Sequence, residues 1–320
     1  MSVLIFAELD EGKLKKSSQE AIFYGAKVAQ MLGTSATAIV LGAADQGELA
    51  TAGRFGATKV LHAADARLNE PNGMAYASVV AAAAQQESAK VIVLAKSSLA
   101  DAMAARLAGK LKAGLAANVV DLPDLANGFR VKRSIYTSKA FAVTELTADT
   151  KILAIKKNTI TPEETDAAAT VDAFTPALND ADFVLKVTNT EKATGDVLLP
   201  EADLVVSAGR GLKGPENWGI VEELAKALGA ATACSKPVSD LDWRPHHEHV
   251  GQTGIKVSPN LYIAAGISGA IQHLAGVNSS KVIVVINKDP EAPFFKSADY
   301  GIVGDVFEVL PRLTKAVQAL

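Results

Sequence analysis

The chain has 320 residues, of which 49% are hydrophobic and 21% are charged, and its formal net charge at pH 7 is −3. This length allows two domains with a sizeable core in each, and the composition is that of an ordinary globular protein. The slightly negative charge excludes a general basic surface for nucleic acid, and the single cysteine, Cys234, excludes an internal disulfide and a multi-cysteine metal cluster.

The first 112 residues alternate β-like and helix-like patterns. Short apolar runs are expected to form strands, and segments with apolar residues three or four apart are expected to form helices. The expected strands are residues 3–7, 36–41, 59–62 and 91–95, and the expected helices are 18–32, 46–55, 73–86 and 99–112. Such alternation indicates βαβ units around a parallel sheet.

The pattern then changes. Alternating or Thr-rich runs at 130–136, 140–146 and 151–155 follow one another with short gaps, which favours an antiparallel extension of the sheet. From residue 158 to about 200 the chain is rich in Thr, Asp, Glu and Ala with little periodicity. We expect a linker there, with one strand at 183–187.

A second alternating region begins at residue 202. Its expected strands are 202–206, 231–233, 261–265 and 282–286, and its expected helices are 215–228, 269–275, 300–308 and 310–320. The fold class is therefore α/β, with two doubly wound domains of mainly parallel sheets, the first with an antiparallel extension and the second Rossmann-like. We place the boundary near residue 195, giving domains 1–195 and 196–320.

The N-terminus enters a strand at once and has no basic segment followed by a long apolar one, so no signal peptide is expected. No apolar run reaches the roughly 18 residues that cross a bilayer. We therefore expect no membrane insertion and a reducing, aqueous compartment, either the bacterial cytoplasm or, for a processed organelle protein, the mitochondrial matrix.

The candidate site lies in the loops of the second domain, because ligands of open parallel sheets bind beyond the carboxyl ends of the strands. Glycines let the backbone approach a ligand, and Arg210 offers a forked cation for phosphate or a ring edge. Four loops carry such residues: 207–212 with Arg210, 234–237 with Ser235 and Lys236, 251–254 with Gln252 and Thr253, and 266–270 leading to His273. Taken singly, the first two are better explained as ordinary turns.

The turn at 266–270 joins an expected strand to an expected helix. Backbone N–H groups at such a turn bind phosphate well, because the first helical donors have no partner inside the helix. A nucleotide cofactor is therefore the first ligand to test. Asn287 and Asp305 add an amide and a carboxylate suited to a purine edge and ribose hydroxyls, although Asp305 is equally suited to cap a helix.

Two other interpretations are weaker. The turn around Ser268 is similar to the nucleophile elbow of α/β-hydrolases, but that elbow needs glycine where Ala270 stands, and His273 follows too soon in the chain. The cluster His246-His-Glu-His249 lacks the His-Glu-x-x-His spacing of a zinc site, so a solvated loop is expected there.

Together these residues resemble the α subunit of electron-transfer flavoproteins. The segments that match in order and spacing are 209–212, 250–254, 266–276, 286–293 and 299–305, whereas the N-terminal half agrees only in its alternation of strands and helices. The resemblance implies a heterodimer with a related β subunit and one FAD in the C-terminal domain. It also implies an electron carrier rather than an enzyme with its own metabolite, which takes electrons singly from acyl-CoA or other dehydrogenases, as in fatty-acid β-oxidation, and delivers them to a quinone oxidoreductase or another acceptor.

The resemblance also implies a role for each site residue. The isoalloxazine ring is expected among Arg210, Ser235, Gln252, Thr253 and His273, and the pyrophosphate at Ser268 and its neighbours. The adenosine end is expected at Asn287 and Asp305. The remaining residues of the expected set are Lys236, Gly254, Gly266, Ile267, Gly269, Ala270 and Gln272. Lys236 stands where the family commonly has arginine, and lysine keeps the charge but loses the planar fork, which leaves the redox tuning open.

Three alternatives remain beside this hypothesis. An electron-bifurcating relative would carry a second flavin on its β subunit, which this chain alone does not reveal. A pyridine-nucleotide dehydrogenase is disfavoured because no Gly-x-Gly-x-x-Gly followed by an acidic residue comes after the first strands. A purely structural protein would bind no FAD.

Overall fold

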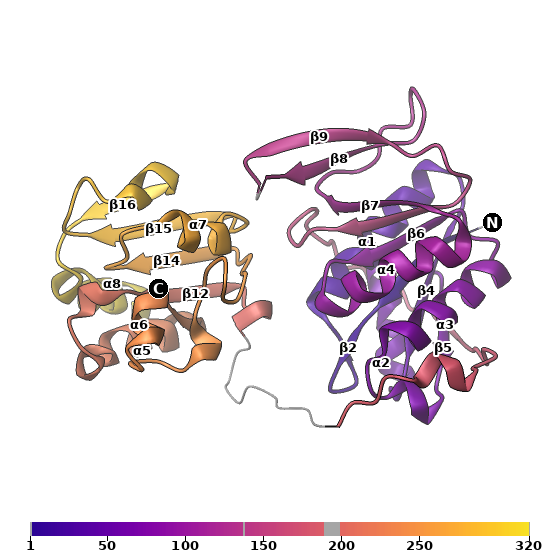
Figure 1. Ribbon diagram of the computed structural model, residues 1–320, viewed down its shortest axis with the longest axis horizontal. Coiled ribbons are helices and arrows are strands. Elements are labelled where there is room, and N and C mark those ends of the chain that lie inside the picture. The colour runs from indigo at the N-terminus through magenta and orange to yellow at the C-terminus, as the bar shows by residue number, and fades with distance from the viewer. Residues whose placement is uncertain (1, 137, 189–198, 320) are drawn as a thin grey trace. The chain divides into compact units, whose positions relative to one another are not determined.

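The computed structural model describes residues 2–136, 138–188 and 199–319. The chain divides into two compact units, Met1–Thr190 and Glu191–Leu320 (Figure 1). The expected domain boundary near residue 195 falls in the segment 189–198, outside the described residues. Each unit has its own sheet and its own cores, so each is considered by itself.

The first unit is built on a nine-stranded sheet in the order β11-β5-β4-β1-β6-β10-β7-β8-β9. All neighbours from β11 to β7 run parallel, and β8 is antiparallel to its two neighbours β7 and β9. The strands are β1 (Ser2–Ala7), β4 (Ser35–Leu41), β5 (Lys59–Ala63), β6 (Val91–Ala95), β7 (Gly114–Val119), β8 (Arg130–Ile135), β9 (Ala140–Glu145), β10 (Lys151–Ile155) and β11 (Thr170–Ala173). A small hairpin, β2 (Leu9–Asp10) and β3 (Lys13–Leu14), stands apart from this sheet.

Helices cover both faces of this sheet, because alternate residues of the buried strands face opposite sides. Val3 and Ile5 pack into the core under α1 (Lys16–Met31) and α2 (Gln46–Ala50). Leu4 and Phe6 pack into the core under α3 (Gly73–Gln86) and α4 (Ser98–Leu111). Figure 1 shows the helices on the two sides of the sheet. The expected doubly wound parallel sheet is confirmed.

Two expectations for the first unit are wrong. Residues 151–155 form a strand with the expected bounds, but β10 lies between β6 and β7 in the parallel sheet and not in the antiparallel extension. Its run from Ile152 to Ile155 is buried throughout, which is the pattern of an interior parallel strand. The strand expected at 183–187 is absent from the described residues, because Phe183 ends the short 3₁₀ helix Asp180–Phe183 and residues 184–188 form no strand.

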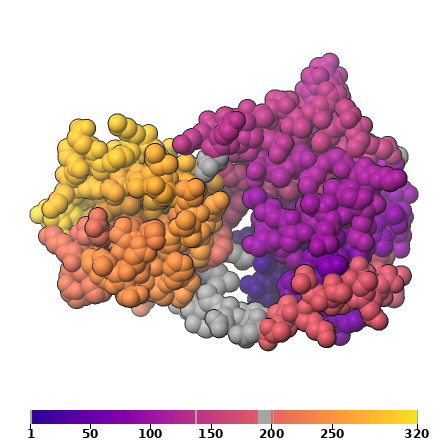
Figure 2. All heavy atoms as spheres, viewed as in Figure 1, coloured from indigo at the N-terminus to yellow at the C-terminus, as the bar shows by residue number. Residues whose placement is uncertain are grey.

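The antiparallel extension is the hairpin of β8 and β9. Along β9, partly buried and exposed side chains alternate, so that Phe141 and Val143 are exposed. In the space-filling view this magenta segment lies on the surface of the first unit (Figure 2). A half-covered antiparallel pair at the edge of a parallel sheet is a common way to end such a sheet.

The second unit has a five-stranded, entirely parallel sheet in the order β13-β12-β14-β15-β16. The strands are β12 (Leu204–Ala208), β13 (Ala231–Cys234), β14 (Leu261–Ala265), β15 (Val282–Asn287) and β16 (Tyr300–Val303). The helices are α5 (Gly219–Leu228), α6 (Lys236–Asp240), α7 (Ile271–Val277) and α8 (Val306–Gln318). One core lies against α5 and α8, and the other lies on the opposite face with Tyr262, Val277 and Phe294.

One expectation for the second unit is wrong. Residues 300–308 were expected to form a helix, but Tyr300–Val303 is the edge strand β16, and α8 begins at Val306. The β-branched pair Ile302 and Val303 suits a strand, and the Asp305 side chain caps the helix by accepting from the Phe307 N–H. Among the described residues, none of the helices has the length and the apolar character that a membrane crossing requires.

Candidate functional site

The strand order of the second unit creates a topological switch point. From β12 the chain moves outward to β13, and it then crosses back over β12 to form β14 on the other side. The chain after β12 therefore continues toward one edge of the sheet and the chain after β14 toward the other edge, and in open α/β sheets ligands bind at such a point. The sequence 209–212 follows β12, and the sequence 266–270 follows β14.

Glycines let the two loops meet backbone to backbone at this point. The Gly209 N–H donates to the Ala265 carbonyl at 2.9 Å, and the Gly211 N–H donates to the Gly266 carbonyl at 3.1 Å. A Cβ atom on Gly211 would lie 2.6 Å from the Gly266 Cα atom, closer than real Cβ contacts allow. Gly266 has a φ of +62°, the left-handed region that favours glycine. The close approach therefore requires these glycines.

The turn 266–270 is fixed from two sides. The Asn287 side chain donates from Nδ2 to the Ile267 carbonyl at 3.0 Å, and the Phe294 N–H donates to the Ser268 carbonyl at 3.1 Å. The carbonyl groups of Ile267 and Ser268 are thus engaged, while within the described residues the N–H groups of 267–270 have no acceptor. Free N–H groups on a fixed turn are suited to an anion such as a pyrophosphate.

The turn 250–254 is attached to the start of α7. The Gln252 N–H donates to the Gln272 carbonyl at 2.7 Å, and a Cβ atom on Gly276 would lie 2.6 Å from the Gly251 nitrogen. The side chains of Gln252 and Thr253 are exposed, and in the described part of the chain they make no hydrogen bond. Two side chains with unused donors and acceptors thus lie on a turn whose backbone is bonded to α7.

His273 lies below this turn and is buried. Its Nε2 atom is 3.0 Å from the hydroxyl of Tyr262 on β14, whereas its Nδ1 atom has no partner among the described residues. Burial, with a smaller contribution from His249, lowers the pKa of His273 to about 4. The imidazole is therefore neutral at pH 7, so His273 supplies no positive charge to the site.

Two exposed cations remain near the switch point. Arg210 follows β12 directly, and its side chain is exposed. Lys236 begins α6 after the buried Ser235, whose N–H donates to the Ala208 carbonyl at the end of β12. The Lys236 Nζ atom is 2.9 Å from an Asp240 carboxylate oxygen one turn further on, and both side chains are more than half exposed. Asp240 thus offsets part of the Lys236 charge.

Asn287 and Asp305 hold the local backbone. The Asn287 Oδ1 atom accepts from the Asp289 N–H at 3.0 Å, so both ends of this amide are engaged, and the Gly304 N–H donates to the Asn287 carbonyl. Asp305 caps α8, as one of its two sequence interpretations had it. Each side chain keeps part of its hydrogen-bonding capacity, since an amide has two N–H donors and a carboxylate has two oxygens.

These bonds link every segment of the expected site. They run from Ser235 to β12, from 209–211 to Gly266, from Ile267 to Asn287, and from Gln252 to Gln272. The sequence had missed three side chains that complete the arrangement, namely Tyr262, Asp240 and His249. Asp240 stands four residues after Lys236, a spacing that is itself a signal for an ion pair on a helix.

The structure also bears on the two weaker interpretations, the serine nucleophile at Ser268 and the histidine cluster at 246–249. The structure shows no hydrogen bond between Ser268, which is exposed, and His273, whose Nε2 atom faces Tyr262. No group of three or more metal-binding side chains is found among the described residues. The solvated loop expected at 246–249 is half wrong, because Glu248 and His249 are buried, and Glu248 accepts a two-pronged pair of bonds from Arg244 at 2.9 and 2.6 Å.

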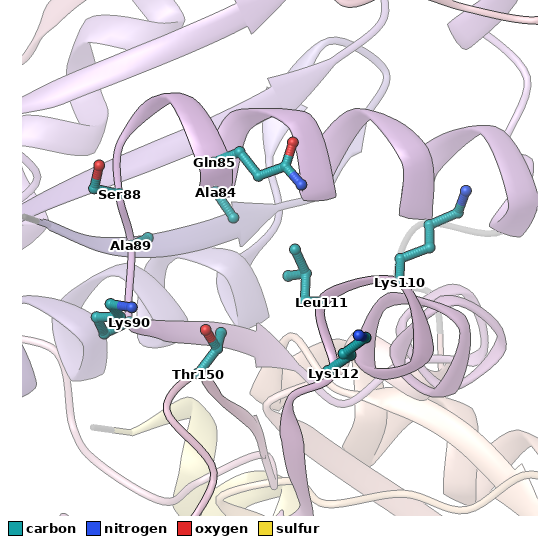
Figure 3. A pocket seen from close by; sticks show the side chains of 9 residues that line it. All are labelled: Ala84, Gln85, Ser88, Ala89, Lys90, Lys110, Leu111, Lys112 and Thr150. Carbon is teal, nitrogen blue, oxygen red and sulfur yellow. The ribbon is translucent and has the colours of Figure 1, made fainter.

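A groove of about 340 Å³ lies elsewhere, in the first unit, at the amino ends of β6 and β10. Its lining includes Lys90, just before β6, and Lys110 and Lys112 at the end of α4 (Figure 3). None of the residues expected to bind the cofactor lines this groove. It lies at the opposite end of the strands from the edge where ligands of parallel sheets bind.

Comparison with known proteins gives one consistent result. The family model described as electron transfer flavoprotein domain matches residues 3–180, and the one described as electron transfer flavoprotein FAD-binding domain matches residues 198–278. The chain is 36% identical over 323 residues to the electron transfer flavoprotein subunit alpha of Bacillus subtilis (strain 168), covering 99% of this chain and 98% of the relative. It is 35% identical over 316 residues to Protein FixB of Clostridium saccharobutylicum, covering 97% and 94%.

A solved structure of a putative thiamin diphosphate-dependent enzyme from Mycobacterium smegmatis also matches, at 14% identity, with 98% of this chain and 59% of that chain covered. Its TM-score of 0.23 is too low to carry an argument.

Proposed function

Because the chain belongs to the family of electron transfer flavoprotein α subunits, we propose that it binds one FAD at the carboxyl edge of its second sheet and carries electrons as one half of a heterodimer. The observation that carries this proposal is the glycine contact between 209–211 and Gly266 at the switch point, inside the segment that matches the FAD-binding family. A Cβ atom at any of these glycines would fill the space through which the two loops approach each other.

The residues present fit this cofactor. The N–H groups of 267–270 supply donors for the pyrophosphate, and Gln252 and Thr253 supply unused polar side chains for a ring edge. Asn287 and Asp305 retain capacity for the adenosine end. When bound, FAD supplies the redox chemistry, because it accepts and passes on single electrons.

The chain's own contribution is binding and electrostatics. Arg210 after β12 and Lys236 after β13 place positive charge at the carboxyl edge of the sheet, where it favours negative charge on a reduced ligand. Asp240 reduces that effect through its ion pair with Lys236. His273 is neutral and buried, so its role is to hold the start of α7 against Tyr262 rather than to supply a charge.

The partners follow from the same proposal. The second subunit is a β chain, the donors are acyl-CoA or other dehydrogenases, and the acceptor is a quinone oxidoreductase or another carrier. The heterodimer turns over no metabolite of its own. We place it in the bacterial cytoplasm, which subcellular fractionation tests.

The deciding experiment is co-expression of the chain with its β subunit. Purification should yield a yellow complex with one FAD per heterodimer, measured by absorbance after denaturation and compared with protein mass. Adding a dehydrogenase with its substrate should bleach the complex, while the substrate alone should not. A colourless complex that takes up no FAD on incubation would refute the proposal, and two flavins per heterodimer would instead favour the bifurcating class.

A further inference from the structure

The turn 250–254 is built around the ring of a second histidine. His249 is only 2% exposed. A Cβ atom on Gly254 would lie 2.7 Å from its Nδ1 atom, and a Cβ atom on Gly251 would lie 3.3 Å from its Nε2 atom. The two glycines that bracket Gln252 and Thr253 therefore rest on the two nitrogen-bearing edges of one imidazole ring.

The backbone fixes the ring in this place. The Val250 N–H donates to the Cys234 carbonyl at 3.0 Å, which attaches the histidine segment to the end of β13. The Ile255 N–H donates to the His249 carbonyl at 2.8 Å, which closes the turn. The other side of the turn is bonded to Gln272 in α7. The turn thus lies between the His249 ring and the helix that carries His273.

The surroundings of His249 favour its neutral form. Its Nδ1 atom has no partner in the described part of the chain. Burial lowers the pKa of His249, His246 and Lys236 lower it further, and Asp240 opposes them. A charged imidazole has two N–H donors, and in this position one of them has no acceptor.

The other ionisable groups packed around this segment do not compensate for a charge on His249. The Glu248 carboxylate is bound by Arg244 and by the Thr232 hydroxyl. Burial raises the pKa of the Cys234 thiol to about 12, so the thiol stays neutral. On α7, His273 is itself neutral, and a charge on His249 disfavours a charge on it. The carboxylate that favours a proton on His249 is that of the exposed Asp240, which is already paired with Lys236.

We infer that His249 is a positioning residue of the FAD site: its neutral ring holds the 250–254 turn against α7, and a proton taken up by His249 displaces the turn and releases the cofactor. The inference rests on the proposed FAD binding. It assigns no contact with FAD to His249, which acts through Gln252 and Thr253.

The test compares three forms of the FAD-loaded heterodimer, namely wild type, His249→Gln and His247→Gln. Glutamine keeps a polar side chain but does not titrate between pH 7.5 and 5.5. His247 is the matched control, because it is an exposed histidine two positions away. The FAD dissociation constant is measured at intervals across that pH range from the fluorescence of released flavin. His273 does not titrate in this range, because its pKa is about 4.

The wild type and His247→Gln should lose affinity as the pH falls, by up to about tenfold per pH unit for one linked proton. His249→Gln should show a profile at least about threefold flatter over the whole range, whatever its affinity at pH 7.5. A purely structural role would lower the affinity equally at every pH, and parallel profiles of wild type and His249→Gln would overturn the inference.

A second measurement does not depend on the variant folding. The ring proton resonances of His249 in the wild type should titrate at a lower pH in the FAD-loaded complex than in the FAD-free complex, and equal midpoints would also overturn the inference. Failure of the wild type to retain FAD at pH 7.5 would refute the proposed function. If FAD is retained but the wild type and His249→Gln lose affinity equally as the pH falls, only the role of His249 is refuted.

Discussion

Gly209 and Gly266 touch through their backbones, and a Cβ atom on Gly209 would lie 2.4 Å from the Gly266 carbonyl oxygen. The two residues end neighbouring parallel strands, β12 and β14, at the switch point of the second sheet. Because the atom in the way is a backbone carbonyl, a side chain at position 209 is accommodated only if one of the two loops moves. The position of the turn 266–270 therefore depends on the absence of a side chain at residue 209.

The variant Gly209→Ala should separate the two loops. We expect it to lower the free energy of unfolding by about 1–3 kcal/mol, as overpacking does, and to weaken FAD binding by at least about tenfold. The matched control is Gly219→Ala at the start of α5, where a Cβ atom meets nothing within 4 Å. Urea unfolding and flavin titration measure both quantities, and equal behaviour of the two variants would contradict the proposed contact.

Removing the carboxylate of Asp240 should release Lys236 from its ion pair. The variant Asp240→Asn then leaves more positive charge near the flavin, so the first reduction potential of bound FAD should rise by roughly 10–40 mV, the equivalent of an exposed pair worth about 0.2–1 kcal/mol. Asp242→Asn, an exposed site with no ion pair in the described chain, serves as the control. Spectroelectrochemistry at low salt measures the potential, and a fall on Asp240→Asn would exclude this role.

Acid should destabilise the second unit through His273. Its pKa is about 4 in the folded chain against an ordinary value of 6.5, so the unfolded chain binds the proton more readily. This contribution is complete above pH 6.5 and is lost as the pH falls from 6.5 through about 4, with a total on the order of 3 kcal/mol.

The variant His273→Gln should flatten the dependence of unfolding free energy on pH between 6.5 and 4. Denaturant unfolding of the FAD-free protein at a series of pH values checks this without interference from the cofactor. The control is His247→Gln, which is exposed and should keep the wild-type slope. Identical slopes in all three proteins would show that His273 is not neutral and buried in solution.

Asn287 should contribute to stability and to FAD binding because its side chain fixes the turn 266–270. Replacing it by alanine removes the bond to the Ile267 carbonyl and the bond from the Asp289 N–H, which should cost about 1–3 kcal/mol of stability. If Asn287 acts only through the turn, FAD and free pyrophosphate should weaken by the same factor. If it also contacts the adenosine end, FAD should weaken more. Isothermal titration with both ligands separates the two cases.

The local sequence pattern was sufficient to predict where most strands and helices lie, but not which strands pair with one another in the sheet. Residues 151–155 have the apolar run of a strand, and the structure confirms those bounds. Which strands lie beside β10 depends on pairing with Val91 and Gly114, tens of residues away, and no local signal specifies that choice. The strand Thr170–Ala173 was missed for the same reason, because four residues carry too little pattern and only the pairing with β5 makes them a strand.

Some features of the candidate site could likewise be predicted from the sequence, and others could not. The glycine turns could be predicted from the sequence because glycine has few other reasons to recur at strand ends. The burial of His249 and His273 could not, because burial depends on which loops fold over a residue. The sequence had also favoured a helix over 300–308, although the helix-capping signal at Asp305 marked the true start of α8.

The place of β10 between β6 and β7 bears on how the protein is made. Both neighbours leave the ribosome before Lys151–Ile155 does, so each has one row of unpaired backbone groups until that segment arrives. During this interval the nascent chain resembles a protein with two open sheet edges, which is the state most prone to pair with the wrong strand. Slow translation between residues 119 and 151 would prolong that exposure, and a chaperone that binds extended segments would cover the open edges during it.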